Sequence, residues 1–207
     1  MGPPQADVAM REALAMGADE AILISGREFG GSDTWATSYI IATAIKKIPD
    51  YDIIFCGRQA IDGDTAQVGP QIAEQLNIPQ ITYVQKLDIE GDKVIVQRQL
   101  EDGYTVVEAK MPVLLTAIKE LNTPRYMTPK GIFEAYNKTV QVWGFNDVPV
   151  DAEKIGLKGS PTNVNRTFSP KQRARASCSR VQIRKLLRPL SQSSMKSICC
   201  NRRHIYG

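Results

Sequence analysis

The chain has 207 residues, 43% of them hydrophobic and 7% aromatic, which suits one compact domain with extensions. No run approaches the ~18–20 consecutive apolar residues of a membrane-spanning helix, and residues 1–10 lack the basic and apolar segments of a signal peptide. The four cysteines lack the spacing of a disulfide framework or a zinc site. These features argue against membrane insertion, predict no metal site and favour a reducing, cytoplasmic location.

The charge is divided unevenly along the chain. Residues 1–153 hold all 22 acidic residues and 13 of the 26 lysines and arginines, a net charge of −9. Residues 154–207 hold the other 13 basic residues and no acidic residue, a net charge of +13. Such an asymmetry is typical of an arm that faces nucleic acid or a membrane surface. A nucleic-acid-binding tail over 166–207 is therefore one hypothesis, although few aromatic side chains are present there to stack on bases.

The first part of the chain alternates helical and strand patterns. A helix is expected over 4–16, because a proline suits its first turn and a glycine follows its last. The apolar run 21–25 predicts a buried parallel strand. A second helix is expected over 34–47, with a Ser-Asp-Thr sequence as its cap and a proline beyond its end. The run 52–56 predicts the next strand, and the pattern from about 65 to 76 predicts the next helix.

The pattern then changes to short alternating strands. The segments 81–90, 93–100 and 104–110 are separated by Gly-Asp and Asp-Gly, which are hairpin turn signals. An apolar strand follows over 113–117, and a short helix is expected over 130–136. Together these elements predict an α/β fold with a mostly parallel, twisted sheet and an inserted antiparallel ribbon.

The loop 57–69, between a predicted strand and a predicted helix, is the strongest candidate for a site. In open α/β sheets, ligands bind where the carboxyl ends of strands meet such loops. Gly57, Gly63 and Gly69 allow close backbone approach and positive φ, and the free N–H groups at the start of a helix favour a phosphate. A single glycine-rich loop is a weak signal, so a nucleotide-phosphate loop and an ordinary surface loop both remain open.

Several exact strings resemble one known family. The loop itself reads GRQAIDGDTAQVGP over 57–70, and it is accompanied in order by MGPP (1–4), ALAMGADEAI (13–22), LNTPRY (121–126), KGI (130–132) and GLKGSPTNV (156–164). These strings resemble the beta subunit of electron transfer flavoproteins, almost continuously from Met1 to about Gln172. The resemblance implies that the sheet is of the adenine-nucleotide-binding type.

The resemblance also implies which residues bind a cofactor. These are Met1, Gly2, Pro3, Cys56, Gly57, Arg58, Gln59, Ala60, Ile61, Asp62, Gly63, Asp64, Thr65, Ala66, Gln67, Val68 and Gly69. Thr65 would cap the following helix, and the N–H groups of Ala66–Val68 would point at a phosphate. Asp62 and Asp64 would accept from hydroxyl groups, although a turn and an N-cap are the simpler interpretation. Arg58 would pair with a phosphate, with the edge of a flavin, or in a surface salt bridge.

Two cofactors are compatible with the family. Ordinary members, which pass electrons from dehydrogenases to a quinone reductase, hold AMP in this loop, whereas electron-bifurcating members hold a second FAD. The strings GDTAQVGP over 63–70 and GSPT over 159–162 are similar to the bifurcating group. FAD is therefore expected, with AMP as the alternative. The expected role is an electron carrier subunit rather than an enzyme, since no nucleophile–base pair is evident and the flavin supplies the chemistry.

Partners follow from the same resemblance. An alpha subunit would complete a heterodimer, NADH would supply electrons, and an acyl-CoA dehydrogenase and a low-potential ferredoxin or flavodoxin would receive them. The segment expected to bind the dehydrogenase comprises Arg125, Tyr126, Met127, Thr128, Pro129 and Lys130. Ile132 and Phe133 could belong to this contact or to the protein's own core, and Pro129 replaces a leucine of some relatives.

Three parts of the chain are expected. Residues 1–147 would form the nucleotide-binding α/β domain, which would lack the family's first strand at its N-terminus. Residues 148–172 would form an extended arm toward the partner subunit, with no packed element predicted there. Residues 173–207 follow no family pattern, and their basic, acid-free composition predicts a disordered tail or a shifted reading frame.

Overall fold

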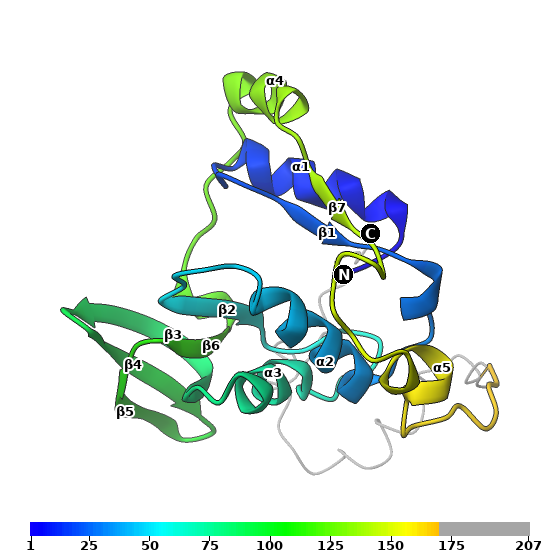
Figure 1. Ribbon diagram of the computed structural model, residues 1–207. Helices are drawn as coiled ribbons and strands as arrows, with labels where there is room; N and C mark the ends of the chain where they lie inside the picture. Colours follow the sequence, from blue (N-terminus) through cyan, green and yellow to red (C-terminus); the bar gives the residue numbers. More distant parts are fainter. Residues whose placement is uncertain (170–207) are drawn as a thin grey trace, which may run out of the picture. The chain divides into compact units, whose positions relative to one another are not determined.

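The computed structural model describes residues 1–169, and Met1–Val164 form one compact unit, distinct from a second that begins at Asn165. Its larger sheet has five strands in the order β2-β6-β3-β4-β5 (Figure 1). The strands are β2 (Ile53–Gly57), β3 (Gln80–Glu90), β4 (Lys93–Leu100), β5 (Gly103–Lys110) and β6 (Val113–Ala117). β2, β6 and β3 are parallel, whereas β3, β4 and β5 form an antiparallel ribbon. The predicted fold class is confirmed.

A second, two-stranded sheet pairs β1 (Ile22–Ile24) with β7 (Gln141–Trp143) in parallel. β7 was not predicted, because three residues are too few to establish an alternating pattern. Its pairing with β1 joins segments that lie more than a hundred residues apart in the sequence.

The longer helices are α1 (Asp7–Ala15), α2 (Thr34–Ile45), α3 (Val68–Leu76) and α4 (Pro129–Asn137); α5 (Gly156–Gly159) is a single turn. Short 3-10 turns occur over Pro4–Ala6, Arg27–Phe29, Lys119–Leu121 and Ala152–Lys154. As expected, α3 ends at Asn77, which is left-handed (φ 54°) and closes the helix. No helix within residues 1–169 is long and apolar enough to cross a bilayer.

Helix α2 is buried on two sides. Ala42 packs with α3 and with Leu114 of β6, and Ile41 and Ile45 lie against the same cluster. Ile40 and Ala44 pack with Ile24 of β1 and with other residues of a separate cluster. The sequence TWATSYIIATAI has apolar residues around the whole helix, as a helix buried on more than one side requires.

The segment after residue 148 also contributes to the core, contrary to the expectation that it contains no packed element. Val148 and Ile155 are buried in the cluster that includes Ile40. Ser160 is buried as well, and its hydroxyl donates to the carbonyl oxygen of Gly156 at 2.6 Å. Val148 and Ile155 pack with residues more than a hundred positions away, such as Ile40, so no local pattern of the sequence predicts their burial. The expected basic tail over 173–207 lies outside the described residues.

The contact of α3 with the sheet depends on a missing side chain. Gly69 is buried, and a Cβ atom there would lie 2.8 Å from Cγ2 of Thr116 and 3.5 Å from Cβ of Cys56. Both neighbours lie on strands of the sheet, β6 and β2. The glycine is therefore required for close packing of the helix on the sheet rather than for an unusual φ.

We expect Gly69→Ala to lower the free energy of unfolding by about 1–3 kcal/mol, because the added methyl group overpacks the helix–sheet contact. Urea denaturation of the purified chain measures the change. Gly63→Ala is the matched control, since a Cβ atom at Gly63 meets nothing within 4 Å. Equal stability of the two variants would show that α3 moves away from the sheet at no cost.

Candidate functional site

A cavity of about 640 Å³ lies at the carboxyl end of β2. We call it the loop cavity, and it is lined by Ser32, Asp33, Thr34, Thr37, Ile41, Cys56, Gly57, Arg58, Gln59, Ala60, Asp62, Gly63, Thr65, Ala66, Gln67, Val68, Gly69 and Ile72. All the predicted loop residues are therefore present except Ile61, which is fully exposed, and Asp64. The structure adds the first turn of α2, which was not predicted to face this loop.

The loop backbone differs from the expectation in two ways. Helix α3 begins at Val68, not near residue 65, and its N-cap is Gln67, so the predicted capping role of Thr65 is wrong. The reason is that Asp64 (φ 51°) and Ala66 (φ 54°) are both left-handed, which interrupts a helix at this point. The positive φ values expected at glycines thus occur at Asp64 and Ala66 instead.

Two helix N-termini meet at the loop cavity. The first residues of α2 and of α3 both line it. The unpaired N–H groups of a first helical turn carry partial positive charge, and each helix favours a nearby anion by ~0.3–1 kcal/mol when exposed. At α2 this anion is already the Asp33 carboxylate, which accepts from the N–H of Ala36 at 3.0 Å, whereas the N-terminus of α3 has no side-chain cap and suits a phosphate group.

The side chains of the loop cavity offer one positive charge. Arg58 is the single cation among its described lining residues, and its guanidinium lies 5.9 Å from the ring centre of Tyr83. The amide of Gln59 donates to the carboxylate of Asp64, so both side chains are occupied within the loop. Asp62 is exposed and forms part of the lining. Phosphate binding here would therefore depend more on backbone N–H groups than on cations.

Cys56 lies at the inner end of the loop cavity, near the end of β2. Its side chain packs with the cluster formed by α2, α3 and β6. Burial raises the pKa of the thiol, because the charged thiolate is poorly solvated there. Within residues 1–169, no cluster of histidine, cysteine or carboxylate side chains is arranged to hold a metal ion.

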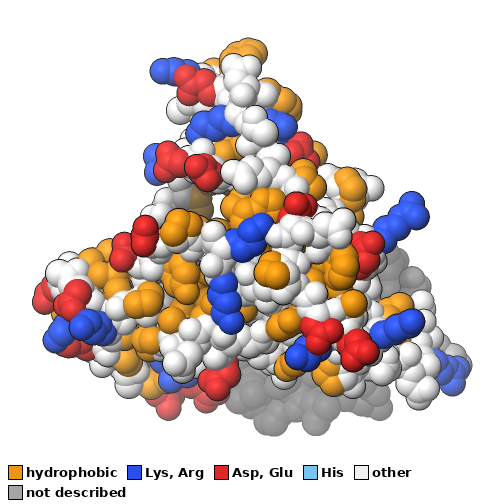
Figure 2. Space-filling view, viewed as in Figure 1, with side chains coloured by type: hydrophobic (Ala, Val, Ile, Leu, Met, Phe, Trp, Pro, Cys, Tyr) orange, Lys and Arg blue, Asp and Glu red, His pale blue; other side chains and the backbone are white. Residues whose placement is uncertain are grey.

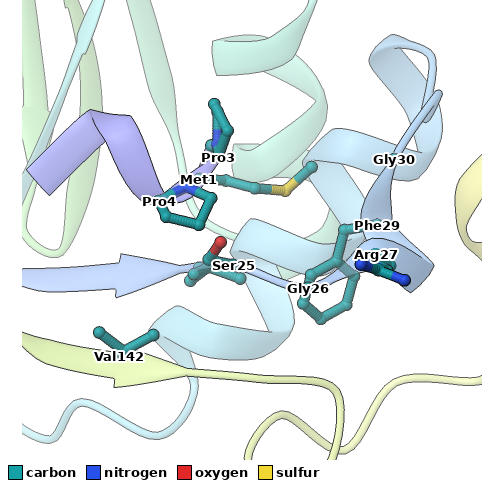
Figure 3. A pocket seen from close by; sticks show the side chains of 11 residues that line it. Met1, Pro3, Pro4, Ser25, Gly26, Arg27, Phe29, Gly30 and Val142 are labelled. Carbon is teal, nitrogen blue, oxygen red and sulfur yellow. The ribbon is translucent and has the colours of Figure 1, made fainter.

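Met1, Gly2 and Pro3 lie in a different cavity, of about 760 Å³, beside the end of β1 (Figure 3). The N–H group of Gly2 donates to the carbonyl oxygen of Ile24 at 3.0 Å, so this segment runs along the strand edge. Figure 3 shows the side chain of Ser25 pointing toward Met1 and Pro4. The structure thus assembles residues 56–69 in one cavity and Met1–Pro3 in another.

The predicted partner segment leads into α4. Thr128 caps the helix by accepting from the N–H of Gly131 at 3.0 Å, and Pro129 occupies its first position. Tyr126 is almost fully exposed, and Phe133 is 75% exposed. Apolar side chains are visible at this end of the molecule in Figure 2. Phe133 therefore belongs to the surface and not to the core, and Ile132 is exposed as well, whereas their contact with a partner stays a prediction.

Helix α4 is held in place by α1. The Arg11 guanidinium donates to the carbonyl oxygen of Ala135 at 2.7 Å and to that of Lys138 at 3.2 Å, which satisfies the end of α4. Lys138 in turn donates to the carbonyl oxygen of Ala18 at 2.8 Å. The exposed side chains of α4 are thus presented from a fixed helix.

A family model described as the electron transfer flavoprotein domain matches residues 1–148. The chain belongs to this family. Within it, the chain is 66% identical over 171 residues to an electron transfer flavoprotein subunit beta of Thermoanaerobacterium thermosaccharolyticum, covering 82% of this chain and 65% of that relative. The resemblance to the beta subunit found in the sequence is therefore confirmed.

Two further proteins that are similar to this chain carry more specific names. Subunit CarD of the caffeyl-CoA reductase-Etf complex of Acetobacterium woodii is 56% identical over 170 residues, which cover 82% of this chain and 65% of CarD. The acryloyl-CoA reductase electron transfer subunit gamma of Anaerotignum propionicum is 55% identical over 180 residues, 84% of this chain and 67% of the relative. The chain thus spans about two thirds of the length of these relatives.

We expect Cys56 to react slowly with iodoacetamide at pH 8. Its raised pKa leaves less thiolate than in free cysteine at that pH, and the rate increases only as the pH rises above the ordinary thiol range. A variant with Cys178, Cys199 and Cys200 replaced by serine isolates this thiol, and mass spectrometry measures alkylation against pH. The same variant in urea is the control; a folded profile that coincides with the unfolded one would contradict the expectation.

Proposed function

We propose that this chain acts in the cytoplasm as the electron-carrying beta subunit of a heterodimeric electron transfer flavoprotein. The loop cavity is the observation that carries the proposal. It combines the carboxyl end of a parallel strand, a loop in which two residues have left-handed backbone conformation, and the N-termini of α2 and α3. This arrangement suits an adenine nucleotide. The family match over residues 1–148 includes every one of these elements.

The donor set of the loop cavity fits the adenylate part of FAD. The first N–H groups of α3 would hold phosphate, Asp62 would accept from a ribose hydroxyl, and Ile41 and Ile72 provide an apolar surface for adenine. Arg58 would contribute a positive charge. When bound, FAD would supply hydride acceptance from NADH and the release of single electrons to the alpha-subunit flavin and to ferredoxin or flavodoxin.

An acyl-CoA dehydrogenase is the proposed partner. Two relatives are named as parts of caffeyl-CoA reductase and acryloyl-CoA reductase systems, which favours a partner that acts on an acyl-CoA. The exposed surface of residues 125–130 and Phe133 is the proposed contact, because aromatic side chains presented by a fixed helix are typical anchors of protein interfaces.

AMP is the second candidate for the loop cavity, and one observation favours it. Met1–Pro3 line a separate cavity, so the loop cavity by itself offers contacts for an adenylate group and not for a whole dinucleotide. In that case the loop would have a structural role in a simple carrier.

We expect the chain, co-expressed with the alpha subunit, to contain two FAD per heterodimer. Denaturing release and chromatography measure the nucleotides. One FAD with one AMP would instead support the simple carrier. The heterodimer without any nucleotide beyond that of the alpha subunit would refute the assignment of the loop cavity.

We expect Phe133→Ser to raise the apparent KM for the dehydrogenase by about tenfold in an electron-transfer assay, because an exposed aromatic anchor is lost. Nucleotide content should not change, since Phe133 does not line the loop cavity. Val106→Ser, at an exposed apolar position of β5, is the matched control. Equal KM values for the two variants would exclude α4 from the contact.

A further inference from the structure

One side-chain hydrogen bond joins the two helix N-termini at the loop cavity. The Thr34 hydroxyl, in the first turn of α2, donates to Oε1 of Gln67 at 3.1 Å. Gln67 is the N-cap of α3, yet its side chain forms no capping bond to that helix. The amide of Gln67 is therefore held from α2 and not from its own helix.

The first turn of α2 is a fixed platform for this bond. The carboxylate of Asp33 accepts from the N–H of Ala36 and from the N–H of Thr162, both at 3.0 Å. The N–H of Asp33 donates to the hydroxyl of Ser160 at 2.9 Å, and Ser160 is only 5% exposed. Both carboxylate oxygens and the amide of Asp33 are thus occupied, which ties α2 to the segment 156–162.

In the structure, the bond from Thr34 leaves the other end of the Gln67 amide for the loop cavity. With Oε1 occupied by a hydroxyl donor, the side chain has only its NH2 group to offer to the loop cavity, which it lines. Within residues 1–169 no side-chain acceptor is paired with Nε2 of Gln67. The result is a neutral donor beside the N-terminus of α3, in a cavity whose described lining includes Arg58 as its one cation.

We propose that Thr34 is a positioning residue that holds the Gln67 amide with its NH2 group available to a phosphate of the bound adenine nucleotide. This inference rests on the proposed nucleotide-binding function. Thr34 acts through Gln67, so its contribution exists only while the glutamine amide is present. Because serine carries the same hydroxyl on the same platform, Thr34→Ser preserves the effect, and valine, which has the same shape without a donor, abolishes it.

A double-mutant cycle on the full chain tests the inference, with AMP and FAD as probes and calorimetric Kd values as the readout. We expect Thr34→Val and Gln67→Met each to weaken binding by about threefold to tenfold, as the loss of one neutral hydrogen bond implies. The double variant should bind as Gln67→Met does, and Thr34→Ser should remain within about twofold of the wild type. Thr43→Val is the matched control, since its hydroxyl bonds to Tyr39 of α2, outside the cavity lining.

The outcomes separate two failures. Unchanged binding by Thr34→Val, or additive losses in the double variant, overturns the positioning role while nucleotide binding by the wild type stands. A wild-type chain that binds neither AMP nor FAD overturns the proposed function and the positioning role together. Thermal unfolding of each variant shows whether a loss of binding is caused by a loss of folded protein. Thr43→Val shows the effect of removing a hydroxyl of α2 that lies outside the cavity lining.

Discussion

Burial of α2 on two sides is the constraint on which the rest of the structure depends. One side of this helix packs against α3 and β6, and the other packs against β1 and the segment that contains Val148 and Ile155. The two-stranded sheet depends on this helix to bury Ile24, because a two-stranded sheet is at best marginally stable alone. The position of α2 is therefore determined by the core and not by any ligand.

The candidate site inherits this rigidity at its edges. Core packing places the N-terminus of α2 beside the loop, and the close approach of Gly69 to Thr116 places the N-terminus of α3. Between these fixed points, the middle of the loop is exposed, with Ile61 wholly in solvent. A rigid frame with an exposed loop is the usual basis of a binding site, since the frame sets the geometry and the loop adapts to the ligand.

The sequence predicted the elements whose pattern is local. The apolar runs, the hairpin turn residues, the cap before α2 and the Asn77 stop of α3 all follow from neighbours in the sequence. What it did not predict depends on distant contacts. Strand β7 exists because it pairs with β1, and Ser160 is buried where its hydroxyl accepts from the N–H of Asp33.

In the candidate site, too, the features with a local sequence pattern were predicted and those that depend on distant contacts were not. The loop 57–69 was predicted from its own residues, whereas the Ser-Asp-Thr sequence of α2 was interpreted only as a helix cap. That interpretation is correct for Asp33, but no sequence rule places the cap beside the loop. The start of α3 was predicted too early because left-handed Asp64 and Ala66 are not glycines, and such residues rarely adopt positive φ.

The charge of the site follows from these local structures. Asp33 lines the loop cavity, but its carboxylate is bound to two backbone N–H groups and lies at the positive end of α2, so its charge is largely offset. Among the described residues that line the cavity, Arg58 is the one cation. A bound anionic ligand would therefore depend mainly on oriented dipoles, from the N-terminus of α3 and from the Gln67 amide, and dipoles act only over short distances. For that reason small changes in the orientation of one neutral side chain matter more here than the net charge of the chain.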